Sequence, residues 1–218
     1  MRIPQVQKEY YWKENYTSLE RFISLYFQID AIRKLKPSSI LEIGIGNKVV
    51  YNFFKNNGAK IVGGDHDACL GPDIILDIDK LPITGGCFDI VSACEVLEHL
   101  PFEFLPGVLH ELKRVSKRYI LISMPYITVN IYGFVKPVPL IKPMYFLKRL
   151  SEAFWISHKW DHKHYWEMGK KGYSRKLTRS IIRDCGLEIK EEFTPFLNPC
   201  HYFFVLEKRK KEWVEKES

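Results

Sequence analysis

Two apolar runs of this sequence end in residue types that suit a nucleoside ligand. The first run contains Glu42 and leads into Gly44 and Gly46, and the next run ends in Asp65. Glycines let the backbone come close to a ligand where a side chain would block it. A carboxylate at the end of the following strand can accept hydrogen bonds from both hydroxyl groups of a ribose. The pattern predicts a nucleoside site at the carboxyl edge of a parallel sheet.

The elements that would position these residues alternate between strand-like and helix-like patterns. The predicted strands cover residues 40–43, 60–64, 73–77, 88–93 and 119–123. The predicted helices cover residues 17–35, 49–56, 102–115 and 174–185. Alternation of this kind is typical of a parallel sheet covered by helices. Two final strands, at 187–193 and 201–206, are joined by a short link, which favours an antiparallel pair.

The N-terminal part is aromatic and then helical. The predicted apolar face of helix 17–35 comprises Leu19, Phe22, Ile23, Tyr26, Phe27 and Ile29. Tyr11, Trp12 and Tyr16 precede this helix. These three side chains could cover the bound ligand, or they could pack on the sheet, and the sequence leaves both alternatives open.

Four segments, taken in order, resemble the motifs of class I S-adenosylmethionine-dependent methyltransferases of the small-molecule branch. They are residues 41–46, 64–65, 76–82 and 88–100. The resemblance implies an α/β fold with a doubly wound, mostly parallel seven-stranded sheet (Rossmann-like). It also implies an antiparallel last strand, an N-terminal helix and an insertion after strand five. We expect one domain over residues 1–218, in which 1–36 is a helical cover and 126–172 is a lid that holds the substrate.

The resemblance implies S-adenosylmethionine as the cofactor and assigns its contacts. These residues are Glu42, Gly44, Gly46, Asp65, His66, Asp77, Ile78, Cys94 and Glu95. Asp65 would bind the ribose hydroxyls, and Asp77 would accept the adenine amino group. The negative charge of Glu42 would order the loop amides. Glu98 and His99 follow this motif, and both a substrate-facing and a purely structural role are open for them.

The glycine spacing argues against a nicotinamide-dependent oxidoreductase. Gly46 is followed by Asn47, Lys48 and Val49, with no third glycine where a dinucleotide-binding turn has one. Lys48 either pairs with a carboxylate of the cofactor or points to solvent.

Histidines of the lid are the candidates for proton transfer. His164 is the predicted catalytic base, since histidine titrates near neutral pH and aromatic residues flank it. His158 and His162 stand four residues apart, with Asp161 between them. That spacing matches no standard metal site, so we predict no metal. Packing within the lid is the alternative reading of these histidines.

Residues 126–155 are more apolar than a solvent loop requires. Packing of a lid or a dimer contact would account for them. The alternative is a hydrophobic pocket or a membrane-facing surface. On such a surface, anionic lipid headgroups would contact four basic residues, Lys136, Lys142, Lys148 and Arg149.

Composition narrows the cellular setting. The 218 residues carry a net charge of +7, and the five cysteines include no CxxC pair. Thiols of this kind are typical of a reducing compartment. With no apolar signal segment at the N-terminus, we expect a cytoplasmic protein, and a peripheral membrane contact is left open.

We therefore predict an enzyme that methylates a small or medium-sized acceptor, for which a sugar or a lipid-linked glycan is an example. The alternatives are an RNA or protein methyltransferase and a non-catalytic S-adenosylmethionine-binding protein. The net positive charge favours a nucleic acid substrate, but the sequence shows no separate RNA-binding module. Ala93-Cys94-Glu95-Val96 stands where an Asn-Pro-Pro-Tyr type tetrapeptide would hold a flipped base. The sequence therefore does not favour a nucleic acid partner.

Overall fold

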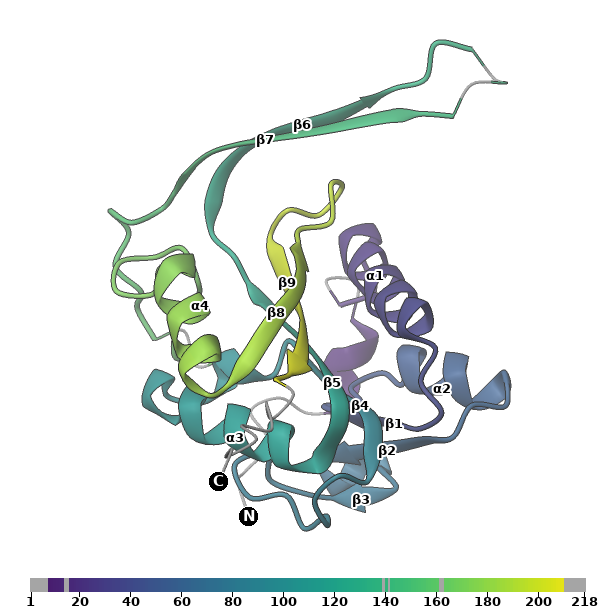
Figure 1. Ribbon diagram of the computed structural model, residues 1–218. Coiled ribbons are helices and arrows are strands. Elements are labelled where there is room, and N and C mark those ends of the chain that lie inside the picture. Colours follow the sequence, from purple (N-terminus) through teal and green to yellow (C-terminus); the bar gives the residue numbers. More distant parts are fainter. Residues whose placement is uncertain (1–7, 14–15, 139, 141, 161–162, 210–218) are drawn as a thin grey trace, which may run out of the picture.

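The computed structural model describes residues 8–13, 16–138, 140, 142–160 and 163–209, and a seven-stranded sheet forms its centre (Figure 1). The strands of this sheet are β1 (Ile40–Ile43), β2 (Ile61–Asp65), β3 (Ile74–Ile75), β4 (Phe88–Cys94), β5 (Ser116–Pro125), β8 (Leu187–Phe193) and β9 (His201–Lys208). Their order across the sheet is β3-β2-β1-β4-β5-β9-β8. Neighbours from β3 to β5 are parallel, and β9 runs antiparallel to both β5 and β8. The predicted Rossmann-like fold is confirmed.

Helices cover both faces of the sheet (Figure 1). The α-helices are α1 (Leu19–Leu35), α2 (Val49–Asn56), α3 (Leu105–Val115) and α4 (Arg175–Asp184). Short 3-10 turns are η1 (Lys8–Trp12), η2 (Ala68–Leu70), η3 (Leu97–His99) and η4 (Phe102–Phe104). Alternate strand residues face opposite sides, so Ile40 and Ile90 pack with α1 and α2, whereas Leu41 and Val91 pack with α3 and α4. Two apolar layers therefore hold the strands whose ends form the site.

The prediction of the apolar face of α1 is wrong for three of its six residues. Leu19, Phe22 and Tyr26 are exposed, whereas the buried face of the helix includes Ser24 and Gln28. The Ser24 hydroxyl lies 2.6 Å from His201 Nδ1 and accepts a hydrogen bond from Asn198 Nδ2 at 3.0 Å. These hydrogen bonds turn a polar stripe inward, which apolar periodicity cannot reveal.

The insertion after β5 begins with a separate hairpin that the sequence pattern did not predict. Its strands, β6 (Thr128–Val135) and β7 (Met144–Glu152), pair only with each other. The hairpin, here called the arm (residues 128–152), projects away from the seven-stranded sheet (Figure 1). Neither of its faces is fully covered, so the alternation of polar and apolar residues that marks a half-buried strand is missing.

No helix within the described ranges is both long and apolar enough to cross a bilayer.

Candidate active site

A cavity of about 310 Å³ opens where β1, β2 and β4 end. Of the predicted cofactor contacts, those that line it are Gly44, Gly46, Asp65, His66, Asp77, Ile78, Cys94 and Glu95. The predicted base, His164, lines it as well. Parallel strands end at one edge of the sheet, which brings these residues together from distant parts of the chain. Glu42 is the predicted contact that the lining leaves out.

Gly44 and Gly46 shape one wall of the cavity. Their φ angles are +81° and +46°, in the left-handed region that favours glycine. A Cβ atom on Gly44 would lie 2.5 Å from Val96 Cγ2. A Cβ atom on Gly46 would lie 3.1 Å from the hydroxyl oxygen of Tyr16. Both turns therefore need glycine for backbone shape and for space.

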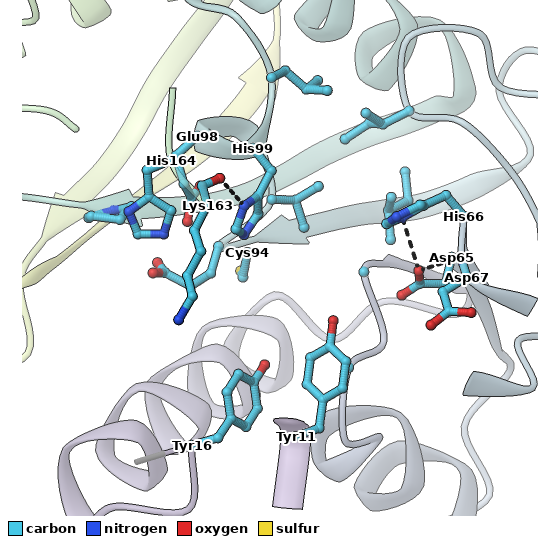
Figure 2. A pocket seen from close by; sticks show the side chains of 18 of the residues that line it. Tyr11, Tyr16, Asp65, His66, Asp67, Cys94, Glu98, His99, Lys163 and His164 are labelled. Atoms are coloured by element: carbon cyan, nitrogen blue, oxygen red, sulfur yellow. Dashed lines mark hydrogen bonds and ion pairs between the residues drawn. The ribbon is translucent and has the colours of Figure 1, made fainter. Parts of the chain in front are cut away.

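The N-terminal aromatic residues divide between cavity and solvent. Tyr11 and Tyr16 line the cavity and point toward it, as Figure 2 shows, whereas Trp12 is exposed. Burial raises the pKa of the Tyr16 phenol to about 12, so this hydroxyl is neutral and can donate a hydrogen bond. The N-terminal segment thus contributes a wall to the site.

Asp65 lies at the end of β2 and is only 4% exposed. Its Oδ1 accepts a hydrogen bond from the backbone N–H of Asp67 at 3.0 Å and lies 3.3 Å from His66 Nδ1. The contact with Asp65 raises the pKa of His66. Within the described part of the chain, Asp65 Oδ2 has no hydrogen-bond partner, so this oxygen can serve a ligand in the cavity.

Asp77 and Ile78 follow β3 and line the same side of the cavity. Asp77 Oδ1 is buried and has no hydrogen-bond partner among the residues described. A buried acceptor without a donor is costly unless a ligand supplies that donor. The position therefore fits the predicted role toward an amino group.

Glu42 lies in β1, outside the cavity lining. Burial, and then the nearby Asp65 carboxylate, raise the pKa of Glu42 to about 8. Its Oε2 has no hydrogen-bond partner in the described structure. A carboxyl that is mostly protonated at neutral pH cannot supply the negative charge that the sequence suggested for ordering the loop amides.

Lys48 does not line the cavity and contacts a neighbouring loop. Its φ is +62°, and its ammonium donates a hydrogen bond of 2.7 Å to the backbone oxygen of Gly71. The side chain therefore ties two loops together beside the site.

Cys94 ends β4, Glu95 follows it, and both residues line the cavity. Burial raises the pKa of the Cys94 thiol to about 12, which keeps it neutral and poorly nucleophilic. Glu95 has a φ of +55°, an uncommon backbone shape for a residue with a side chain. Its carboxylate accepts a hydrogen bond from the Ser123 hydroxyl at 2.8 Å and lies 3.1 Å from His201 Nε2.

His201 is a cavity residue that the sequence analysis missed. It is the first residue of β9, and its ring bridges Ser24 and Glu95. Burial lowers the pKa of His201. Because β9 is antiparallel, it begins at the edge where its neighbours end. The first residue of the antiparallel strand therefore lies at the same edge of the sheet as the ends of the parallel strands.

The other side of the cavity gathers Glu98 and His99 from η3 with His164 from the lid (Figure 2). Glu98 is 1% exposed, and both of its carboxylate oxygens lack a hydrogen-bond partner in the described residues. Burial, and next the charge of Glu95, raise the pKa of Glu98 well above its ordinary value. His164 Nδ1 lies 2.9 Å from Glu167 Oε1, and this contact lowers the pKa of Glu167 to about 2.

The other predicted histidines stand apart from the cavity wall or cannot be placed. His158 Nε2 lies 2.8 Å from the backbone oxygen of His164, which gives it a structural role. Asp161 and His162, considered above with the metal question, lie outside the described residues.

Residues 41–119 match the family of methyltransferase domains. Solved structures with a similar fold include an S-adenosylmethionine-dependent methyltransferase from Clostridium acetobutylicum, which is 9% identical, with 93% of this chain and 97% of that chain covered and a TM-score of 0.61. A SAM-dependent methyltransferase from Archaeoglobus fulgidus is 15% identical, with 93% and 100% covered and a TM-score of 0.59. Magnesium protoporphyrin IX methyltransferase from Synechocystis with bound SAM is 14% identical, with 94% and 86% covered and a TM-score of 0.58. No curated protein matches the chain in sequence.

The structural likeness, at these identities, concerns the fold, and the family match concerns the segment from β1 to β5. Together they show a methyltransferase-type fold whose segment from β1 to β5 matches a methyltransferase domain.

Proposed function

We propose that this protein is a class I S-adenosylmethionine-dependent methyltransferase that methylates a hydroxyl group of a small or medium-sized acceptor, such as a sugar or a lipid-linked glycan. The observation that carries the proposal is the division of the cavity. Asp65 and His66 lie on one side, and Glu98, His99 and His164 gather on the other (Figure 2). One side suits a nucleoside, and the other offers carboxylate and imidazole groups to a hydroxylated molecule.

The cofactor side fits S-adenosylmethionine through groups that need a partner. Asp65 Oδ2 and the buried Asp77 Oδ1 are acceptors for hydroxyl and amino donors. The turn at Gly44 and Gly46 leaves room that side chains would fill. When bound, the cofactor supplies a methyl carbon on a sulfonium for in-line attack by the acceptor oxygen. The residues of the chain would bind the cofactor and the acceptor, orient the two reacting atoms and exclude water from them.

The acceptor side carries the candidates for taking the hydroxyl proton. His164 is our proposed base, because Glu167 holds its Nδ1 and thereby orients the ring at the cavity wall. His201 is the second candidate, since Glu95 and Ser24 fix its ring in the same way. An oxygen acceptor needs such help more than an amine does.

The arm supports a lipid-linked acceptor. Its exposed apolar side chains include Ile131, Phe134, Met144 and Phe146. The arm contains four basic residues and one acidic residue, Glu152, which ends β7. An apolar surface with a mainly basic charge complements an anionic lipid surface, and we propose that surface as the partner of the arm.

The test is transfer of labelled methyl from S-adenosylmethionine in a cell extract, followed by separation of lipid, small-molecule, RNA and protein fractions. We expect label in a lipid or small-molecule fraction that survives mild alkali, because a methyl ether resists it and a methyl ester does not. The variant His164→Ala should transfer at least about tenfold less label. Its affinity for the cofactor should be nearly unchanged.

Two outcomes would contradict the proposal. Label confined to RNA or protein would favour the macromolecular alternative. Binding of the cofactor with no label in any fraction would favour a non-catalytic binding protein.

A further inference from the structure

The cluster of Glu98, His99 and His164 has the composition of a metal site. One ligand atom from each of these side chains lies within 4.8 Å of the other two. Nitrogen and carboxylate donors bound to one divalent ion sit about 2.0–2.2 Å from it, and so about 3–4 Å from one another. Side-chain adjustments of about an ångström would therefore close the cluster around an ion.

The buried carboxyl group of Glu98 lacks the partner that such a group normally has. Glu98 is 1% exposed, and neither of its oxygens has a hydrogen-bond partner among the described residues, although the side chain lines the cavity. Its nearest acidic neighbour, Glu95, is already engaged with Ser123 and His201. Buried carboxylates are normally paired, hydrogen-bonded or bound to a metal, and two oxygens without partners are a strong departure from that rule.

Both histidines are held as metal-binding histidines usually are. His99 Nδ1 lies 2.8 Å from the backbone oxygen of Lys163, which can only accept a hydrogen bond. His164 Nδ1 lies 2.9 Å from the Glu167 carboxylate. In each ring Nδ1 must therefore be the protonated nitrogen, and the lone pair of the neutral imidazole is on Nε2. An outer acceptor that fixes the ring in this tautomer is typical of histidine ligands.

The residues around the two histidine rings are held in place by further contacts. The ammonium of Lys170 lies 2.5 Å from Glu167 Oε2, which keeps that carboxylate in place. His158 Nε2 lies 2.8 Å from the backbone oxygen of His164. The lid is thus anchored at the residues that position the cluster.

We infer that Glu98, His99 and His164 bind a divalent first-row metal ion at the acceptor side of the cavity. Two imidazoles and one carboxylate suit ions such as Zn²⁺, Mn²⁺ or Co²⁺, and three protein ligands leave coordination positions open. An acceptor hydroxyl bound at an open position would be oriented by the ion and would lose its proton to water more readily. The inference rests on the proposed function only for this last role. Metal binding itself requires no acceptor.

Sequence spacing points away from a metal because residues 158–164 alone match no standard metal site. The fold instead places His164 beside two residues of η3, the turn that follows β4, and this neighbourhood is not visible along the chain. Under this inference His164 acts as a ligand, and the hydroxyl-activating role proposed for it as a base passes to the ion.

The experiment uses the full chain after dialysis against a chelator. Calorimetric titration with Zn²⁺ should give one ion per chain, and Co²⁺ should produce visible absorption bands of a site with nitrogen and oxygen ligands. Glu98→Gln keeps the shape of the side chain and should weaken metal binding by about 100-fold, as should His164→Ala. His110→Ala, which removes an exposed histidine of α3, should leave binding unchanged.

The inference is overturned if the parent protein binds no Zn²⁺ or Co²⁺ at millimolar concentration. It is equally overturned if Glu98→Gln and His164→Ala, shown to be folded by thermal melting, bind these ions as the parent does. The outcome is separate from the proposed function: transfer to a hydroxyl without metal would refute the ion alone. Metal binding without any transfer to a hydroxyl would refute the proposed acceptor alone.

Discussion

Gly44 shows how one position can serve both the fold and the ligand. Its φ of +81° and the 2.5 Å approach of Val96 Cγ2 leave no room for a side chain. Gly44→Ala should destabilise the protein by about 2–4 kcal/mol, since backbone strain adds to overpacking. Binding of S-adenosylmethionine should weaken as well. Urea unfolding and calorimetry measure the two effects.

Gly58 provides the matched control. Its φ is +77°, but no atom lies within 4 Å of the position that a Cβ atom would take at this glycine. Gly58→Ala should therefore lose only about 1 kcal/mol, from strain, and should leave cofactor binding intact. Equal losses in the two variants would show that the contact with Val96 is unimportant.

The buried Glu42 gives the protein a specific dependence of stability on pH. The folded pKa is about 8, raised from an unfolded value near 4.5. Between these values the folded state keeps a proton that the unfolded state has released. The free energy of unfolding contributed by this group is therefore fully present below about pH 4.5 and is lost as pH rises toward 8.

Glu42→Gln should remove that contribution to the pH dependence. Relative to the parent, the variant should gain about 2–4 kcal/mol of stability between pH 5 and pH 8 in the absence of ligand. Urea unfolding at several pH values measures the difference. Parallel curves for the two proteins would contradict the raised pKa.

The arm is the element whose behaviour should depend most on its surroundings. Lys136, Lys142 and Lys148 are exposed on it, close to apolar side chains that are exposed as well. Reversing all three to glutamate should weaken binding to anionic vesicles by about 100-fold or more, because each basic residue near such a surface contributes about 1 kcal/mol. Vesicle sedimentation at physiological salt measures the effect.

A matched charge change elsewhere separates the arm from net charge. Lys60, Lys171 and Lys176 are exposed outside the arm, so their reversal changes the total charge equally. That control should retain most of the binding. If both triple variants lose binding alike, the attraction is a property of the whole basic protein and the arm has no special role.

Elements with local patterns were predictable, and elements held by distant contacts were not. The helix predicted at 49–56 has those bounds in α2, because its apolar spacing and the Asn57-Gly58 ending are both local. The strands of the arm escaped prediction, since neither face packs on a core to impose alternation. The polar side of α1 escaped for a related reason, as its partners Asn198 and His201 come from the other end of the chain.

The same distinction holds for the site. Gly44, Gly46 and Asp65 stand in motifs that can be read along the sequence, and each lines the cavity. His201 and the cluster around Glu98 depend on the direction of β9 and on the path of the lid. Their meeting is a property of the fold, which sequence spacing cannot express.

The whole molecule encloses the cavity by joining its two variable segments. The ammonium of Lys163, in the lid, donates a hydrogen bond of 2.8 Å to the hydroxyl of Tyr10 and lies over the ring of that residue. The N-terminal cover and the lid therefore meet above the edge of the sheet. We expect this contact to help exclude water from the groups that react.

The central claim concerns the nucleoside pocket, and calorimetric titration with S-adenosylmethionine tests it most directly. We expect the parent protein to bind one cofactor per chain, and Asp65→Ala to bind it about 30- to 150-fold more weakly, equivalent to about 2–3 kcal/mol. Asp184→Ala, at the exposed end of α4, should bind as the parent does. No heat of binding with the parent protein, or an unchanged dissociation constant in Asp65→Ala, would contradict the account.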